Sequence, residues 1–284
     1  MPLSIRLPHL PTLPWPSRET RRKWVVRSAP WLEDVGLFTT FAWRTVAAMP
    51  AVLSRRTRFR EFVVQMDTLG VGALPITHIT GVIGGLLLGV QTKVALRQFG
   101  VTTLFPQMLT LALVREVGPT FVALIAGGRA ASGITSELAT MSVTQQVDAL
   151  RALRRDPVQT LAAPRTLASI VAFPLLSFMG VVAGMFGGML VGRSYLNQGP
   201  TFFFNQALIV LNMREIVPNL IVKPMVFGLL IGIVASHLGL GTEGGTRAVG
   251  GSTVRAVVAV TVGILILDYL VGEVFRRAWP PPPF

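Results

Sequence analysis

The sequence predicts an all-α integral membrane protein, because its composition is apolar, its uncharged runs are long and its positive charge lies beside those runs. Apolar residues make up 51% of the 284 residues and charged residues only 14%, whereas soluble domains are about a quarter charged. Four uncharged runs are near or beyond the roughly 18–20 residues that a helix needs to cross a bilayer. These runs are Thr68–Thr92, Thr166–Gly192, Ser194–Met213 and Pro224–Thr242.

The net charge of +13 is distributed as in a membrane protein and not as in a nucleic-acid-binding protein. Eleven of the 26 Lys and Arg residues fall in residues 1–60, and five more fall in 127–165. These segments flank the predicted spans, where positive charge sets topology and meets anionic lipid headgroups. We therefore expect a cytoplasmic N-terminus and no nucleic-acid partner.

The chain is expected to have two tails around one membrane domain. Residues 1–30 are rich in Pro and Arg and predict a disordered cytoplasmic tail, and residues 276–284 predict a Pro-rich C-terminal tail. The domain between them covers 31–275. Its first part, 31–53, is apolar but carries Glu33, Asp34 and Arg44, which favours a helix lying in the membrane interface.

Hydrophobicity along the domain predicts about five transmembrane helices, with the C-terminus outside. A further segment, 201–215, is interpreted as a surface or partly inserted helix. The five predicted spans are 69–92, 101–128, 166–192, 216–240 and 254–274.

A polar segment at 129–157 separates the second span from the third. It must lie in water, because lipid rejects so many charges. Apolar residues from Ile134 to Leu153 recur at steps mostly compatible with one helical face. This predicts an amphipathic helix at 134–155, held at the membrane surface and available to a soluble partner.

Two spans carry glycines at four-residue spacing, which lets neighbouring helices approach closely in a membrane. The spacing does not say whether the contact lies within one subunit or between subunits. The predicted packing glycines are Gly81, Gly85 and Gly89, and Gly180, Gly184, Gly188 and Gly192.

Ionisable residues inside the apolar blocks are costly and need partners. Arg115 and Glu116 precede Pro119 and are interpreted as an adjacent ion pair, either lining a transport path or ending a re-entrant hairpin. Arg214-Glu215 repeats the pattern and is assigned to the surface. For Asp268 we favour structural pairing, with an Arg or with Ser or Thr of a neighbouring helix.

No catalytic or metal constellation is visible in the sequence. The chain has no Cys and only three His residues, which are far apart. It has no Walker loop, and its match to the dinucleotide fingerprint at 239–244 follows a membrane span and not a strand. We therefore expect no cofactor on this chain and no enzymatic activity.

The sequence closely resembles the MlaE-type permeases, also called MCE-associated or YrbE-like, of bacterial lipid ABC transporters. The resemblance covers about residues 35–275. It rests on LVREVGP at 113–119, AGGRAASG at 126–133, ELATMSVTQQVDAL at 137–150, KPMVFG at 223–228 and TVRAV at 253–257. One departure is Gln145-Gln146-Val147, where the family often has an acidic residue before Gln.

The resemblance implies a multi-pass protein of the bacterial inner membrane that moves phospholipid or a related lipid. Its implied partners are a second copy of the chain, a cytoplasmic ABC ATPase that carries ATP and Mg²⁺, and MCE-domain proteins outside. The segment 134–155 resembles the helix that couples to the ATPase, with contacts expected from Glu137, Met141, Thr144, Gln145, Gln146, Asp148, Leu150 and Arg151. The expected lipid-cavity residues are Leu88, Leu96, Phe99, Arg115 and Glu116.

Three alternatives stay open on the residues alone. An ATPase-independent secondary transporter would need an ion path through the membrane. A lipid-modifying enzyme would need a nucleophile or metal site near the interface. A membrane scaffold that recruits a soluble complex would keep the coupling helix and make the cavity residues irrelevant.

Overall fold

A computed structural model of the chain describes residues 30–54 and 56–278. The chain divides into two compact units, Met1–Thr40 and Phe41–Phe284. The described part of the first unit is the beginning of helix α2 alone. Of the expected tails at 1–30 and 276–284, residues 1–29 and 279–284 lie outside the described residues, and Pro30 begins α2. Residues 276–278, which we had assigned to the C-terminal tail, instead continue the last helix.

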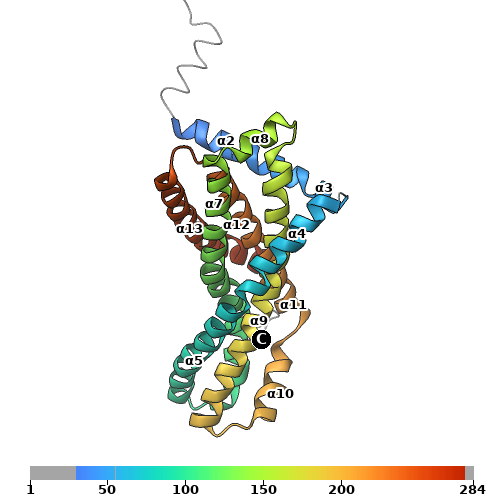
Figure 1. Cartoon of the computed structure of the whole chain (residues 1–284). Helices are drawn as coiled ribbons and strands as arrows, with labels where there is room; N and C mark the ends of the chain where they lie inside the picture. The colour runs from blue at the N-terminus through green and yellow to red at the C-terminus, as the bar shows by residue number, and fades with distance from the viewer. Residues whose placement is uncertain (1–29, 55, 279–284) are drawn as a thin grey trace, which may run out of the picture. The chain divides into compact units, whose positions relative to one another are not determined.

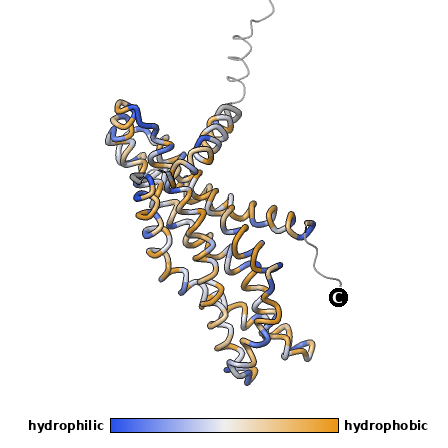
Figure 2. Tube along the Cα trace, turned by 90° about the vertical axis from the view of Figure 1, so that its right-hand side faces the viewer, coloured by the Kyte–Doolittle hydropathy of each residue, from blue (hydrophilic) through white to orange (hydrophobic). Residues whose placement is uncertain are grey.

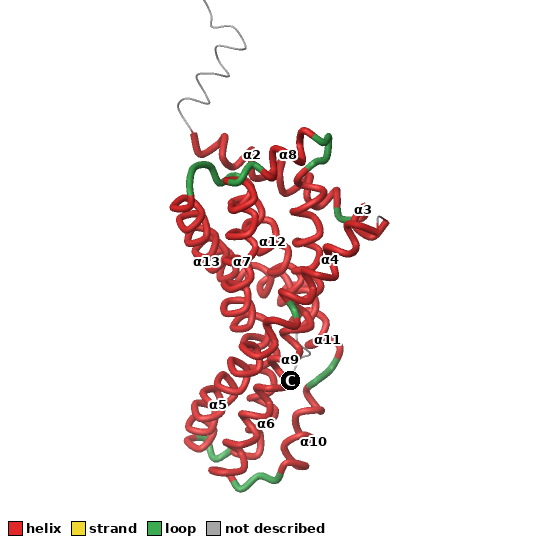
Figure 3. Tube along the Cα trace, in the orientation of Figure 1, coloured by secondary structure: helices red, strands yellow, loops and turns green. Residues whose placement is uncertain are grey.

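The predicted all-α class is confirmed, and the described residues contain no strand (Figure 3). The short 3₁₀ and π segments carry η labels and join the α-helices into longer rods. In chain order the elements are α2 (Pro30–Ala48), α3 (Pro50–Ser54), α4 (Arg56–Leu69), η1 (Val71–Ala73), α5 (Leu74–Gln98), η2 (Thr102–Leu104), α6 (Phe105–Ala112), η3 (Leu113–Phe121), α7 (Val122–Val143), α8 (Gln146–Ala152), η4 (Val158–Ala162), α9 (Ala163–Leu196), α10 (Pro200–Val210), α11 (Met213–Ile216), η5 (Val217–Val222), α12 (Lys223–Leu240) and α13 (Thr246–Ala278).

Six helical segments in the described part of the chain are long and apolar enough to cross a membrane. Five of them cover the five predicted spans except for residue 101, and Figure 2 shows how apolar residues dominate the long helices. Most of these segments extend past the predicted spans, because a helix can continue into water where its sequence turns polar. The five segments are Arg58–Gln98, Thr102–Val143, Val158–Leu196, Met213–Leu240 and Thr246–Ala278.

The sixth segment, Asp34–Ser54, is the one that the sequence assigns to the interface. It is not one straight helix, since α2 ends at Ala48 and α3 begins at Pro50. A proline disfavours the helical conformation of the residue before it, which accounts for the break at Met49. From Phe41 onward much of α2 is exposed, and Trp43 has 73% of its surface exposed.

The three π-helical segments coincide with prolines. Pro119 lies inside η3 and Pro218 inside η5, while η4 is flanked by Pro157 and Pro164. A proline has no N–H and its ring collides with the carbonyl four residues earlier, so an inserted π turn lets the rod continue. The segment Thr102–Val143 is therefore one interrupted rod, and the re-entrant hairpin considered for Arg115 is wrong.

Helices α5 and α9 cross closely because glycines from both helices meet at the crossing (Figure 1). A Cβ atom added to Gly81 would lie 2.4 Å from the carbonyl oxygen of Gly180. One added to Gly85 would lie 1.9 Å from the carbonyl oxygen of Gly184. Both distances are far below van der Waals contact, so no side chain fits. The contact of these stripes lies within one chain.

The other glycines of the two four-residue series pack against bulky side chains. A Cβ atom on Gly188 would lie 2.1 Å from Leu109, and one on Gly192 would lie 3.2 Å from Phe105. On α5, Gly89 faces Val191 in the same way. The glycine face of α9 therefore packs against α5 at Gly180 and Gly184 and against α6 at Gly188 and Gly192.

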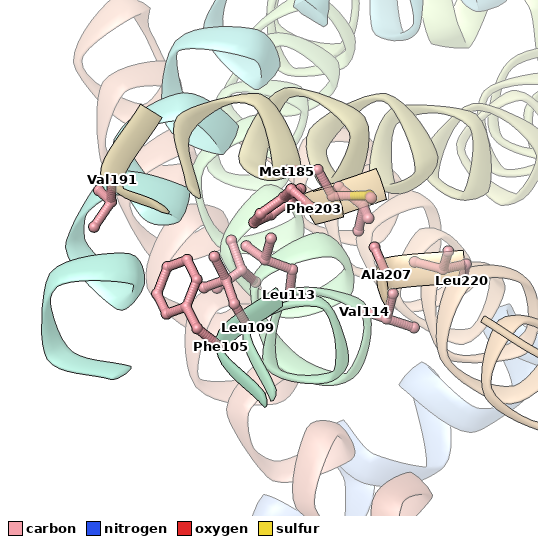
Figure 4. Close-up of a cluster of buried hydrophobic side chains, with 11 residues drawn as sticks. Phe105, Leu109, Leu113, Val114, Met185, Val191, Phe203, Ala207 and Leu220 are labelled. Atoms are coloured by element: carbon pink, nitrogen blue, oxygen red, sulfur yellow. The ribbon is translucent and has the colours of Figure 1, made fainter. Parts of the chain in front are cut away.

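A buried apolar cluster fills the space beside this crossing (Figure 4). It is contributed by α6, η3, α9, α10 and η5, which explains how the short helix α10 is held. Its buried members are Phe105, Leu109, Leu113, Val114, Val117, Val181, Met185, Val191, Phe203, Ala207 and Leu220. In the other half of the unit Phe41–Phe284, helices α7, α12 and α13 pack together (Figure 1).

We predict that Gly85→Ala destabilises the protein by about 1–3 kcal/mol, because overpacking forces two backbones apart. The matched control is Gly272→Ala in α13, where an added Cβ meets nothing within 4 Å. Thermal unfolding of both variants in one detergent–lipid mixture measures the difference. Equal midpoints for the two variants would contradict the close crossing.

Candidate functional site

A network of charged side chains lies within the spanning helices and centres on Lys223. Its side chain has only 4% of its surface exposed and lies 2.7 Å from Asp268 of α13. The ammonium also donates to the backbone carbonyl of Arg115 at 3.0 Å, and Glu116 lies 3.8 Å away. Asp268 further accepts a hydrogen bond of 2.5 Å from Thr120. The predicted structural pairing of Asp268 is therefore confirmed, with a lysine as its cation.

The proline of η3 prepares this site. In an α-helix the carbonyl of Arg115 would accept from the N–H of residue 119, but Pro119 has no N–H to give. Lys223 supplies a donor to that carbonyl. The free carbonyl of Arg115 in η3 and the buried ammonium of Lys223 thus satisfy each other's hydrogen-bonding capacity. An apolar environment requires such pairing.

Arg115 and Glu116 do not pair with each other as the sequence had suggested. Adjacent residues on a helix point in different directions. Arg115 instead forms a bidentate pair with Glu215, with bonds of 2.9 Å and 2.6 Å. Glu215 was assigned to the surface with Arg214, and this was wrong for Glu215, because its side chain is only 18% exposed and pairs with Arg115. Asn219 donates to the backbone carbonyl of Glu215 at 3.0 Å.

The other predicted cavity residues lie apart from this network. Leu88 and Leu96 of α5 are partly buried against the apolar cluster of Figure 4. Phe99 follows the end of α5 and has 77% of its surface exposed. The two hollows found near α8 are lined by other residues.

The segment predicted as one helix at 134–155 is divided in the structure. Residues 134–143 are the last turns of α7, and α8 spans only Gln146–Ala152. Between them Gln145 adopts a left-handed conformation, with φ of 61°. The apolar spacing of Ile134 and Leu138 reflects burial inside the bundle, where α7 packs on α12, and not an interfacial face.

Most of the predicted coupling residues are exposed around this turn. Thr144, Gln145, Gln146, Asp148 and Arg151 are exposed, while Met141 and Leu150 are partly buried. Val147 is 2% exposed and anchors α8 to the protein. Asp148 and Arg151 pair with each other at 2.9 Å.

Glu137 differs from the other coupling residues because its partner lies on another membrane-spanning segment. It accepts a hydrogen bond of 2.7 Å from Arg165 of α9, whose side chain is 2% exposed. Arg165 also donates to the carbonyl of Leu161 at 2.9 Å. The pair connects α7 to the beginning of α9, so Glu137 holds the connection in place.

Sequence reasoning missed three residues of these sites, namely Lys223, Glu215 and Arg165. A signal was present for Lys223, since it is the one charged residue within the predicted span 216–240. A charge at such depth marks a paired or functional position. Nothing in the sequence pairs Arg165 with Glu137 or Arg115 with Glu215, because these partners are far apart along the chain.

The described residues thus form a multi-span helical membrane fold, with a polar network inside it and a polar turn between two spans. The family described as permease MlaE matches residues 62–274. The chain belongs to the MlaE permease family. It is therefore a multi-pass membrane permease of a lipid transport system, and as an ABC transporter permease it is a transport subunit.

Several relatives are similar over most of the chain. A probable ABC transporter permease protein of Rickettsia typhi is 34% identical, over 86% of this chain and 93% of its own length. The intermembrane phospholipid transport system permease protein MlaE of Haemophilus influenzae is 31% identical, over 78% of this chain and 85% of its own length. The chloroplastic protein TRIGALACTOSYLDIACYLGLYCEROL 1 of Arabidopsis thaliana is 31% identical over 79% of this chain and 64% of its own length.

We predict that Lys223→Met lowers the free energy of unfolding by about 3–5 kcal/mol, because it leaves Asp268 buried without its cation. The double variant Lys223→Met/Asp268→Leu should recover part of this loss. Lys93→Met is the control, because Lys93 lies over the ring of Tyr195 at 3.8 Å and keeps no buried carboxylate. Denaturation in detergent measures these variants together with the single variant Asp268→Leu, and additive effects of the two substitutions would contradict the pairing.

Proposed function

We propose that the chain moves phospholipid or a related lipid between the bacterial inner membrane and MCE-domain proteins on its outer side. The observation that carries the proposal is the charged network inside the spans of a member of this family. A phospholipid has a charged headgroup and two apolar chains, so a path for it needs polar groups at membrane depth beside apolar surface. The name of the Haemophilus relative supports phospholipid as the cargo class.

Two copies of the chain would enclose the cargo. Leu88, Leu96 and Phe99 lie on α5 or just after it, and Glu116 has 60% of its side chain exposed. Leu88 and Leu96 are partly exposed and Phe99 is exposed, so a second copy that packs here would form the other wall. Glu116 faces both the network and the exterior and would meet the polar part of a lipid.

A separate cytoplasmic ATPase would dock on the exposed residues from Thr144 to Arg151 and would carry the ATP and Mg²⁺. The turn connects two spanning rods directly, since α7 precedes it and η4 with α9 follows. A displacement of α8 would therefore move α7, and the pair between the buried Arg165 and the half-exposed Glu137 would transmit it to α9. Close-packed helices move as rigid bodies, so the motion would reach the crossing with α5.

The topology that this proposal requires has the N-terminus and α8 on the cytoplasmic side. The excess of Lys and Arg in residues 1–60 and 127–165 supports it. The reconstitution experiment is ATP-driven lipid transfer from vesicles that contain the permease, the ATPase and an MCE protein. Transfer along an ion gradient without the ATPase would favour a secondary transporter instead.

We predict that Asp148→Lys releases the ATPase without unfolding the spans, because Asp148 is exposed on α8 and, among the described residues, pairs with Arg151 of the same helix. Co-purification from membranes should fall about tenfold, as expected when a charge is reversed in an interface. Glu243→Lys, in the exposed loop after α12, is the matched control. Undiminished co-purification of Asp148→Lys would exclude α8 as the docking helix.

We predict that Glu116→Gln lowers ATP-driven lipid transfer by about tenfold while ATPase co-purification and thermal stability stay near those of the parent protein. Glu116 is the most exposed acidic member of the network and its contact with Lys223 is long. Glu273→Gln, near the end of α13, is the control. Full transfer by Glu116→Gln would remove Glu116 from the path and favour a scaffold role for the network.

A further inference from the structure

Two adjoining hollows lie where α8 returns to the membrane-spanning helices. Their volumes are ≈ 560 Å³ and ≈ 470 Å³, and both are lined by Arg154, Arg155 and Asp156. Arg44 of α2 and Arg151 of α8 line the first hollow, and Arg58 of α4 lines the second. We call the two together the arginine hollow. None of its residues belongs to the charged network around Lys223.

The arginine hollow has a large excess of positive charge. Five arginines line it, against the two carboxylates of Asp156 and Glu61, which leaves a net charge of +3. Asp156 is held by Arg44 at 3.0 Å, and its other oxygen caps the backbone N–H of Val158. The carboxylate of Asp156 is therefore already used.

Arg154 and Arg155 hold the unused charge. Arg44, Arg58 and Arg151 each have a side-chain partner, since Arg58 donates to Gln159 at 3.0 Å and Arg151 pairs with Asp148. Within residues 30–54 and 56–278, no side-chain hydrogen bond or ion pair is found for Arg154 or Arg155. Two adjacent guanidinium groups that open on the same hollows offer up to ten N–H donors to a ligand.

The backbone that presents these two arginines is strained. Arg154 has φ of 55°, a left-handed conformation that is uncommon for residues other than Gly, Asn and Asp. The N–H of Arg155 bonds back to the carbonyl of Leu150 at 3.0 Å and closes the turn after α8. Strained turns of this kind cluster at ligand sites, because the conformation serves to aim particular side chains.

The walls of the first hollow are apolar as well as basic. They include Phe41, Pro157, Val158 and Leu240. Val158 begins the rod that contains α9, and Leu240 ends α12, so the hollow lies at the ends of two membrane-spanning segments. Trp43, close in sequence to Arg44, is exposed, and tryptophan is typical of the headgroup level.

We propose that the arginine hollow binds the phosphate of an anionic phospholipid of the surrounding membrane. Guanidinium groups form bidentate, charge-assisted bonds with phosphate oxygens, and the apolar walls suit the glycerol backbone and the first methylenes of the acyl chains. An acidic segment of a protein would use the same arginines but would gain little from apolar walls at the ends of membrane spans. The lipid is a resident ligand, distinct from the cargo of the proposed function.

This lipid would connect elements that otherwise meet through few polar contacts. Arg44 comes from α2, Arg58 from α4, and Arg154 with Arg155 from the turn after α8. A single phosphate between them would neutralise their mutual repulsion and fix the turn on which α8 depends. The content of anionic lipid in the membrane would therefore set how rigidly α8 is held.

The test uses the purified full-length chain in nanodiscs of phosphatidylcholine with a minority of phosphatidylglycerol. After release into mild detergent, native mass spectrometry counts the lipids of each class that stay bound. The parent protein should retain phosphatidylglycerol preferentially. Arg154→Gln/Arg155→Gln should lower this retention about thirtyfold, because each of the two cations near the membrane surface contributes about 1 kcal/mol and about 1.4 kcal/mol corresponds to a factor of ten.

Two variants control for charge and folding. Arg154→Lys/Arg155→Lys keeps the charge and should restore most of the retention. Arg276→Gln/Arg277→Gln removes another adjacent pair, which Glu273 already holds, and should retain phosphatidylglycerol like the parent protein. Equal retention by the parent and by Arg154→Gln/Arg155→Gln would overturn the proposal.

Two further outcomes would reassign the hollow. Displacement of phosphatidylglycerol by millimolar inorganic phosphate would make it a site for free phosphate. Loss of ATPase co-purification in Arg154→Gln/Arg155→Gln, with lipid retention unchanged, would make it part of the protein docking surface. Because the lipid count needs no ATP, ATPase or MCE protein, its failure is separate from a failure of the proposed transport function.

Discussion

The buried ammonium of Lys223 is the constraint on which the spanning part of this protein depends. An amine in the interior of a membrane bundle is tolerated only where counter-charges and acceptors surround it. Asp268 from α13 and the carbonyl of Arg115 from η3 supply them. Three separate spanning segments are thereby brought to one point, which packing of similar apolar side chains in lipid does not specify.

The same solution occurs a second time near the α8 turn. Arg165 is buried at the beginning of α9 and is met by the carboxylate of Glu137 and the carbonyl of Leu161. Both buried cations closely follow a π-helical segment: Lys223 is the residue after η5, and Arg165 lies three residues after the end of η4. Irregular backbone, proline and buried charge therefore belong together in this fold. The buried cations donate to backbone carbonyls at these irregular segments, and carboxylates of neighbouring helices neutralise their charge.

Glycine supplies the other half of the architecture. The α5–α9 crossing has no room for a Cβ atom at Gly81 or Gly85, so backbone lies directly against backbone. The sequence predicted close packing from the four-residue spacing but left the partner helix open. The spacing fixes which face of a helix is flat, whereas the identity of the opposing helix depends on how the chain folds back.

Some sequence predictions were wrong because several folds satisfy the same local pattern. The spacing from Ile134 to Leu153 matched a surface amphipathic helix, yet its first part is the buried end of α7 and only Gln146–Ala152 forms α8. A buried face and an interfacial face have the same period, so periodicity does not separate them. Likewise Arg115 and Glu116 are adjacent in the chain, but helical geometry directs them to different partners.

The sequence by itself determined the membrane class, the place of the five main spans, the flat glycine faces and the family. These properties depend on composition and local spacing. A bilayer selects for them directly, because exposing charges or unpaired backbone groups to lipid is costly. Only the tertiary structure decided which charges meet, which helices cross and where the arginines gather. Glu215 with Arg115, Glu137 with Arg165, and Arg44 with Asp156 are far apart in the chain. Their pairing follows from the fold as a whole, and no local pattern encodes it.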